Sequence, residues 1–221
     1  MEKFYHGSSV LFSEFDLAHA LKGAGKVKFV YGVYVTSNYR SAAHYAGANP
    51  EAKHFYVYTV AVPSIGGANF IAFKQPVNPF IVARAEEELG EKIAEKYLCD
   101  GKDFRKFIAK RLTGKVDLEG EKAASQFLLS IGVDFIMWPY NWKNPDLGTN
   151  RAILDVEKAR ILEVEEVELD EKKQFVEGSE RRVKFWTRTS TDFHNCDVIA
   201  KFLPFQLYED AIFSGQRCFF L

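Results

Sequence analysis

The chain has 221 residues, of which 47% are hydrophobic and 15% aromatic, so a sizeable core is expected and disorder is excluded. Its 29 basic side chains nearly balance 30 acidic ones, which excludes a uniformly basic nucleic-acid-binding protein and leaves local basic patches open. The cysteines, Cys99, Cys196 and Cys218, are far apart and lack metal-ligand spacing, so neither a disulfide framework nor a metal site is expected. Because no basic and apolar leader is found, and no run near the ~20 apolar residues of a membrane span, a cytoplasmic protein is expected.

The start of the chain predicts strands. One is expected around Lys3–Tyr5, ending in a His6-Gly7 turn that leads into a glycine-containing loop, and a second is expected over residues 29–36. The aromatic and β-branched run at 54–62 predicts a buried strand.

A short helix is expected between the second and third of these strands. Ser37 or Asn38 is a suitable N-cap, and Gly47 can end the helix. Tyr45 is expected to project from it toward the second strand. Its thin packing face consists of small residues: Ala42, Ala43 and Ala46.

Three further helices are expected between about residues 84 and 131, where the apolar spacing becomes helical, and a strand is expected over 133–138. Leu89, Ile93 and Tyr97 recur at four-residue steps in the first helix, and the third begins at the N-cap Asp117. We expect one insertion packed on a face of the sheet. Its basic residues are expected on solvated helix faces: Lys102, Arg105, Lys106, Lys110, Arg111 and Lys115.

Three motifs before residue 50 have chemical meaning together. His6-Gly7-Ser8 follows the first strand, Tyr34 follows Gly32 in the second, and Tyr45 comes eleven residues after Tyr34. This set resembles the NAD-binding signature of the ADP-ribosyltransferases related to diphtheria toxin and the poly(ADP-ribose) polymerases. Alone, a His-Gly-Ser at the end of a strand is usually a turn, and the two tyrosines are as typical of core aromatic packing. Their joint occurrence in this order favours the resemblance.

The chemistry of NAD explains why these residue types suit it. A flat, cationic nicotinamide ring needs aromatic faces, which Tyr34 and Tyr45 can supply. Neutral His6 can exchange a hydrogen bond with a ribose hydroxyl, and Gly7 gives a carboxamide access to the backbone. The resemblance also implies a ribose contact for Ser8.

The stretch from Thr149 to Leu162 is similar to the third motif of the family, in which a strand opens with a catalytic glutamate. Aligned by Asp155-Val156, that position holds Asn150. An amide can orient a ribose hydroxyl, but it has no charge to stabilise a cationic sugar and no useful basicity. Losing one such electrostatic group costs on the order of 10² to 10³ in rate. We therefore expect transfer of a single ADP-ribose without chain elongation.

Two other positions bear on the resemblance. The family often has a nicotinamide-binding serine at the place that Ala42 occupies here. A carboxylate such as Glu119 or Asp146 is a candidate replacement for the missing base, and the sequence favours neither.

The resemblance implies an α+β fold of the ADP-ribosyltransferase type, with split antiparallel β-sheets and the helical insertion. Residues 1–168 would form the catalytic domain and residues 169–221 an extension packed on it. The implied catalytic residues are His6, Tyr34 and Asn150, with NAD as substrate and a protein side chain or nucleic-acid base as acceptor. A bacterial or phage toxin or effector is the expected setting. The alternatives are a noncatalytic NAD or ADP-ribose-binding module and an NAD glycohydrolase.

The resemblance does not explain the C-terminal region. Residues 181–188 interleave basic and aromatic side chains, which is typical of nucleic-acid grooves and, more often, of an amphipathic edge strand. Residues 194–197 predict a helix start more than a catalytic cluster. The final Cys218–Leu221 has the form of a prenylation box or of an apolar segment that docks an antitoxin or chaperone.

Overall fold

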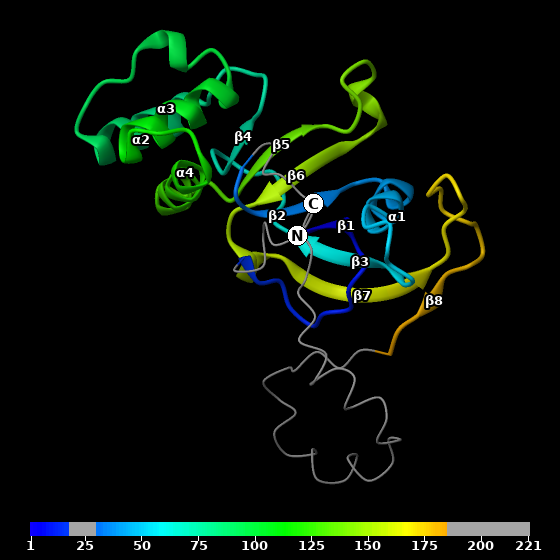
Figure 1. Cartoon of the computed structure of the whole chain (residues 1–221). Helices are drawn as coiled ribbons and strands as arrows, with labels where there is room; N and C mark the ends of the chain where they lie inside the picture. The colour runs from blue at the N-terminus through cyan, green and yellow to red at the C-terminus, as the bar shows by residue number, and fades with distance from the viewer. Residues whose placement is uncertain (18–29, 185–221) are drawn as a thin grey trace, which may run out of the picture.

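A computed structural model describes residues 1–17 and 30–184. Figure 1 shows a twisted sheet with three helices grouped at one end and a single helix, α1, at the other. Short 3-10 turns at Glu95–Tyr97, Pro145–Leu147 and Val156–Lys158 join some elements. The helices and strands are β1 (Glu2–Ser8), β2 (Val33–Thr36), α1 (Tyr39–Ala46), β3 (Phe55–Val62), β4 (Phe70–Ala72), α2 (Pro79–Leu89), α3 (Gly101–Thr113), α4 (Leu118–Ser130), β5 (Phe135–Pro139), β6 (Thr149–Ile153), β7 (Arg160–Val167) and β8 (Arg181–Arg182).

The strands form one eight-stranded mixed sheet in the order β4-β5-β6-β2-β1-β3-β7-β8. Every neighbouring pair is antiparallel except β4 with β5, which are parallel. The fold therefore combines α and β structure, as expected. The expected split into antiparallel sheets differs from the structure, because hydrogen bonds join all eight strands and one pair is parallel.

The sheet nevertheless bends where β1 meets β2. These strands share one register pair, Tyr5 with Thr36, whereas β1 and β3 share seven. One buried cluster contains side chains from both sides of this junction, including Val33 and Phe135 from one half and Tyr58 and Val164 from the other. The two halves thus pack against each other through the same face of the sheet. We call this the core face.

Helices cover the opposite face. Helix α1 packs on β1 and β3, where Ala42 and Ala43 meet Val57. Helices α2, α3 and α4 pack on the other half of the sheet, where Phe104 and Leu128 share a cluster with strand residues that include Ile136 and Ala152. We call this the site face, because Tyr34 and Asn150 lie on it.

The insertion confirms the expected helical character with two corrections. Leu89, Ile93 and Tyr97 do not share one helix, because α2 ends at Leu89 and Gly90 adopts a left-handed conformation with φ of 67°. Arg105 does not lie on a solvated face: it is buried and forms an ion pair with Glu121.

Other sequence-based boundaries changed slightly. Strand β1 continues through His6 and Gly7 instead of turning there, because all its residues from Glu2 to Ser8 pair with β3. Strand β2 begins at Val33 and not at residue 29, which lies outside the described residues. The caps of α1 are Asn38 and Gly47, as expected.

The beginning of the extension adds an edge strand, β8, to β7. Arg182 pairs with Glu163 at 3.0 Å and Arg181 with Glu168 at 3.4 Å, so these two basic side chains face acidic partners on the protein itself. The rest of the basic and aromatic segment lies beyond Lys184, outside the described residues, as do residues 194–197 and Cys218–Leu221. Among residues 1–17 and 30–184, no helix is long and apolar enough to cross a membrane.

Candidate functional site

Residues that are register partners on neighbouring strands form a row of side chains across the site face. Tyr5 of β1 pairs with Thr36 of β2, Thr36 with Asn150 of β6, and Asn150 with Trp138 of β5. Side chains alternate between the two faces of a strand, so residues at even spacing share a face. Tyr34 therefore projects from the same face as Thr36, and its ring meets Trp138 edge-to-face with centroids 5.6 Å apart. Residues far apart in the sequence thus gather at the centre of the sheet.

Tyr34 is held in place at both ends of its side chain. Its hydroxyl donates to the carbonyl of Val30 at 2.7 Å and accepts from the Val30 N–H at 3.0 Å. Its ring is half-buried beside Trp138. Because both the hydroxyl and the ring are fixed, Tyr34 presents a pre-oriented aromatic surface.

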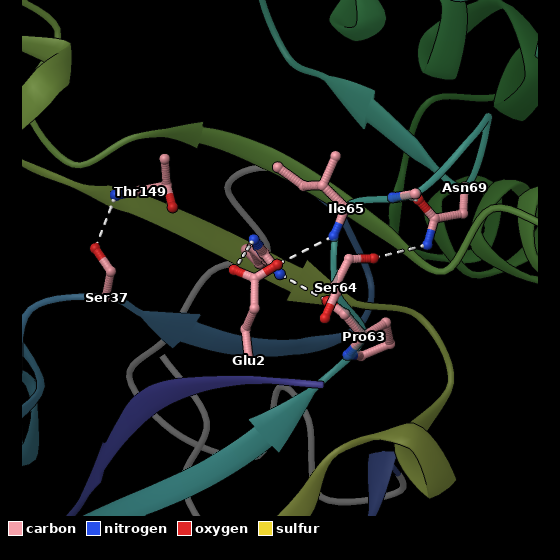
Figure 2. Close-up of polar contacts among 9 residues, drawn as sticks. Glu2, Ser37, Pro63, Ser64, Ile65, Asn69 and Thr149 are labelled. Atoms are coloured by element: carbon pink, nitrogen blue, oxygen red, sulfur yellow. Dashed lines mark hydrogen bonds and ion pairs between the residues drawn. The ribbon is translucent and has the colours of Figure 1, made fainter.

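Asn150 is buried but keeps its hydrogen-bonding groups uncommitted. Only 8% of the residue is exposed, and within the described residues its carboxamide makes no hydrogen bond to the protein. The backbone before it is fixed, because the Thr149 N–H donates to Ser37 Oγ at 2.9 Å (Figure 2) and the Ser37 N–H donates to the Thr149 carbonyl at 2.8 Å. A carboxamide that has no partner in the protein can exchange hydrogen bonds with a ligand on the site face.

Tyr45 reaches the site face from α1. This helix lies so close to β1 that a Cβ on Gly7 would stand 1.8 Å from the Ala42 carbonyl oxygen, and only glycine permits that approach. Tyr45 is 46% exposed, and burial of the rest of its side chain, with a further contribution from Tyr140, raises the pKa of its hydroxyl. Ala42, at the position of the family's serine, is buried against the sheet.

His6 lies on the other face. Its ring contacts Phe12, Phe15 and Tyr58 in the core-face cluster, with centroid distances of 5.9, 5.2 and 6.0 Å. Its Nδ1 lies 2.8 Å from the carbonyl oxygen of Tyr34. Burial lowers the pKa of His6 to about 4, so the ring is neutral near pH 7. Because a carbonyl can only accept, the proton resides on Nδ1.

The structure thus does not bring the His6 ring together with the Tyr34 ring and Asn150. His6 acts on the site from behind, by fixing the Tyr34 backbone at the point where β1 and β2 diverge. Ser8 is likewise buried, and its Oγ accepts from the Val10 N–H at 3.0 Å. Gly7, Tyr34 and Asn150 do lie on the site face, and Tyr45 lies on α1, the helix that packs on that face.

The two carboxylates considered as replacement bases occupy exposed positions. Asp146 lies in the connection from β5 to β6, and Glu119 lies in the first turn of α4. Neither forms a hydrogen bond with Asn150 among the described residues. Elsewhere in those residues, no group of three or more His, Cys, Asp or Glu side chains is arranged to hold a metal ion.

Sequence reasoning missed three residues of the site region: Trp138, Tyr140 and Arg151. Trp138 ends an expected strand, but its proximity to Asn150 depends on the pairing of β5 with β6. Alternation along that strand could have indicated that Trp138 and Tyr140 share a face. Arg151 carried no signal, because a single arginine in an apolar strand does not reveal its partners.

Comparison of the chain with models of protein families, with curated proteins and with solved structures found no significant match. The functional argument therefore depends on the site residues themselves.

Proposed function

We propose that this protein is a mono-ADP-ribosyltransferase that uses NAD on the site face. The observation that carries the proposal is the carboxamide of Asn150, which has no hydrogen-bonding partner in the described residues and lies one strand away from Tyr34. A ligand with hydroxyl groups and a flat cationic ring would match both features.

In this proposal the nicotinamide ring packs against Tyr34, with Tyr45 as the second aromatic side chain. The Asn150 carboxamide accepts a hydrogen bond from a hydroxyl of the adjacent ribose. The bond between nicotinamide and the ribose carbon then breaks, and its electron pair leaves with nicotinamide. A nucleophilic atom of a protein side chain or nucleic-acid base bonds to that carbon and loses its proton.

Asn150 limits this chemistry. An amide orients the ribose but cannot offset the positive charge that develops on the sugar, and it cannot remove a proton from the acceptor. Transfer of one ADP-ribose to a good nucleophile is consistent with such a site, and elongation of a chain is not. His6 contributes by holding the Tyr34 backbone and Gly7 by allowing α1 to approach.

Labelled NAD tests the proposal. The purified protein is incubated with NAD labelled in the adenylate part and with separate pools of cellular protein, RNA and DNA, and free nicotinamide is measured in parallel. We expect label in one pool and its loss, by about 100-fold, in Tyr34→Ala, because an orienting aromatic surface is removed. Tyr97→Ala is the matched control, since Tyr97 stacks on Phe107 in the insertion at 4.8 Å and lies outside the site.

The other outcomes identify the alternatives. Nicotinamide release without label in any pool indicates an NAD glycohydrolase. NAD binding without release indicates a noncatalytic binding module. Absence of binding of both NAD and ADP-ribose by calorimetry rejects all three functions.

A further inference from the structure

Arg151, the neighbour of Asn150 in β6, is an almost fully buried cation with only 2% of its residue surface exposed. Its guanidinium lies between two aromatic rings, 4.3 Å from the centroid of Phe4 and 4.5 Å from that of Phe135. Nη1 donates to the carbonyl of Pro63 at 2.7 Å, and Nη2 pairs with Glu2 Oε2 at 2.8 Å. Burial lowers the pKa of Arg151, and Glu2 opposes that shift.

Glu2 has a second partner that completes the arrangement. Its Oε1 accepts from the Ile65 N–H at 3.1 Å, and Figure 2 shows Glu2 directed toward Ile65 and the chain that follows β3. Glu2 thus connects the guanidinium of β6 with the segment after Pro63. The planar guanidinium suits this role because it donates in two directions at once, which a lysine ammonium on a flexible stem does less well.

These bonds join the two halves of the sheet. Arg151 belongs to the half that contains β6, β2 and the insertion, whereas Glu2 and Pro63 belong to β1 and the end of β3. The backbone connection between the halves is slight, because β1 and β2 share one register pair. The position of Asn150 relative to Gly7 on β1 therefore depends strongly on the bonds that Arg151 makes with Glu2 and Pro63.

Stability alone does not account for a cation at this place. The Arg151 guanidinium is buried while the Glu2 side chain is 40% exposed, so the cost of desolvating the guanidinium offsets much of their attraction, and an apolar residue of similar volume can often fill such a place. A set of directional bonds, in contrast, fixes the relative position of the segments that it joins. The segment fixed here is the backbone of Asn150.

We infer that Arg151, through Glu2 and Pro63, is a positioning residue that sets the location of the Asn150 carboxamide. This inference rests on the proposed function for its catalytic consequence, although the position of the carboxamide can be measured without it. A displacement of about 1 Å at a reacting group can cost on the order of 100-fold in rate.

The test compares Glu2→Gln and the double variant Arg151→Met with Glu2→Gln against the unchanged chain. Methionine keeps apolar volume between Phe4 and Phe135, and the glutamine introduced by Glu2→Gln can still accept from the Ile65 N–H. The control is Glu91→Gln, which breaks the exposed Arg111–Glu91 pair in the insertion, where N and O are 2.6 Å apart. Each protein is labelled with ¹⁵N-asparagine, and the Asn150 carboxamide signal is assigned by its loss in Asn150→Asp.

We expect the Asn150 signal to shift or broaden in both Glu2 variants and to be unchanged in Glu91→Gln. We also expect kcat for nicotinamide release to fall at least about tenfold per folded molecule, with KM changed less than about threefold, because orientation is lost and not affinity. An unmoved Asn150 signal in folded variants overturns the inference, as does a kcat that falls only in proportion to the folded fraction. A moved signal in a chain that shows no reaction with NAD supports the positioning and rejects the proposed function.

Discussion

Asn150 and Arg151 are consecutive residues of β6, yet their side chains lie on opposite faces of the sheet and differ in their hydrogen bonding. On the core face, Arg151 has two hydrogen-bonding partners and two aromatic neighbours. On the site face, the Asn150 carboxamide has no hydrogen-bonding partner within the described residues. The bonds of Arg151 hold segments of the fold together, whereas an amide without a partner in the protein is available to a hydrogen-bonding ligand.

The same contrast holds on β1. His6 is enclosed by aromatic rings on the core face, whereas Gly7 makes room for α1 on the site face. The core face is thus the rigid support of the site face. Loss of stability is therefore expected from His6 on the core face and from Gly7, on which α1 packs. Asn150→Ala on the site face, and the Glu2 and Arg151 variants behind it, should act mainly on NAD chemistry.

The largest expected effect on stability is a pH dependence that comes from His6. The pKa of His6 is about 4 in the folded chain against 6.5 for an ordinary histidine, so between these values the unfolded chain binds more protons. The free energy of unfolding should therefore decrease as pH falls from about 6.5 to about 4, by about 3 kcal/mol in total from this group.

Urea unfolding across this pH range measures the effect. The reference is His6→Gln, which keeps a donor for the Tyr34 carbonyl but does not titrate. Parallel curves for the two proteins would contradict the prediction.

A smaller loss is expected for Gly7→Ala. The added Cβ would overlap the Ala42 carbonyl oxygen, so α1 must move, and overpacking of this kind costs about 2 kcal/mol. Because α1 carries Tyr45, NAD affinity should fall as well. Gly66→Ala is the control, since a Cβ there meets nothing within 4 Å. Equal thermal unfolding midpoints for the two variants would show that α1 moves without loss of stability, which would contradict the prediction.

The smallest effect on stability is expected for Asn150→Ala. No internal hydrogen bond is broken, so the free energy of unfolding should change by less than about 0.5 kcal/mol, while nicotinamide release falls about 10- to 100-fold. Asn69→Ala is the matched control: Asn69 Nδ2 donates to the Ser64 carbonyl at 3.1 Å (Figure 2) and to Asp134 at 2.9 Å. That variant should lose about 1 kcal/mol and keep its activity. A reversed pattern, with Asn150→Ala unstable and active, would remove the distinction between the faces.

Local signals were strong enough to predict several elements. Asn38 and Gly47 bound α1 because each satisfies backbone groups at a helix end, and that chemistry is contained within a few residues. The strand at 55–62 followed from its β-branched and aromatic run. The sequence alone also carried His6, Tyr34 and Asn150, the three residues from which the catalytic hypothesis was built.

Tertiary structure decided the faces and the partners. Whether His6 points toward Tyr34 or away from it depends on where β1 pairs and diverges, and a strand's register is set by distant segments. Arg105 and Arg151 are buried because particular partners from other elements offset their desolvation, which no local pattern encodes. Composition and spacing thus determined which chemical groups the chain possesses, whereas packing of segments far apart in sequence determined which of those groups are left available to a ligand.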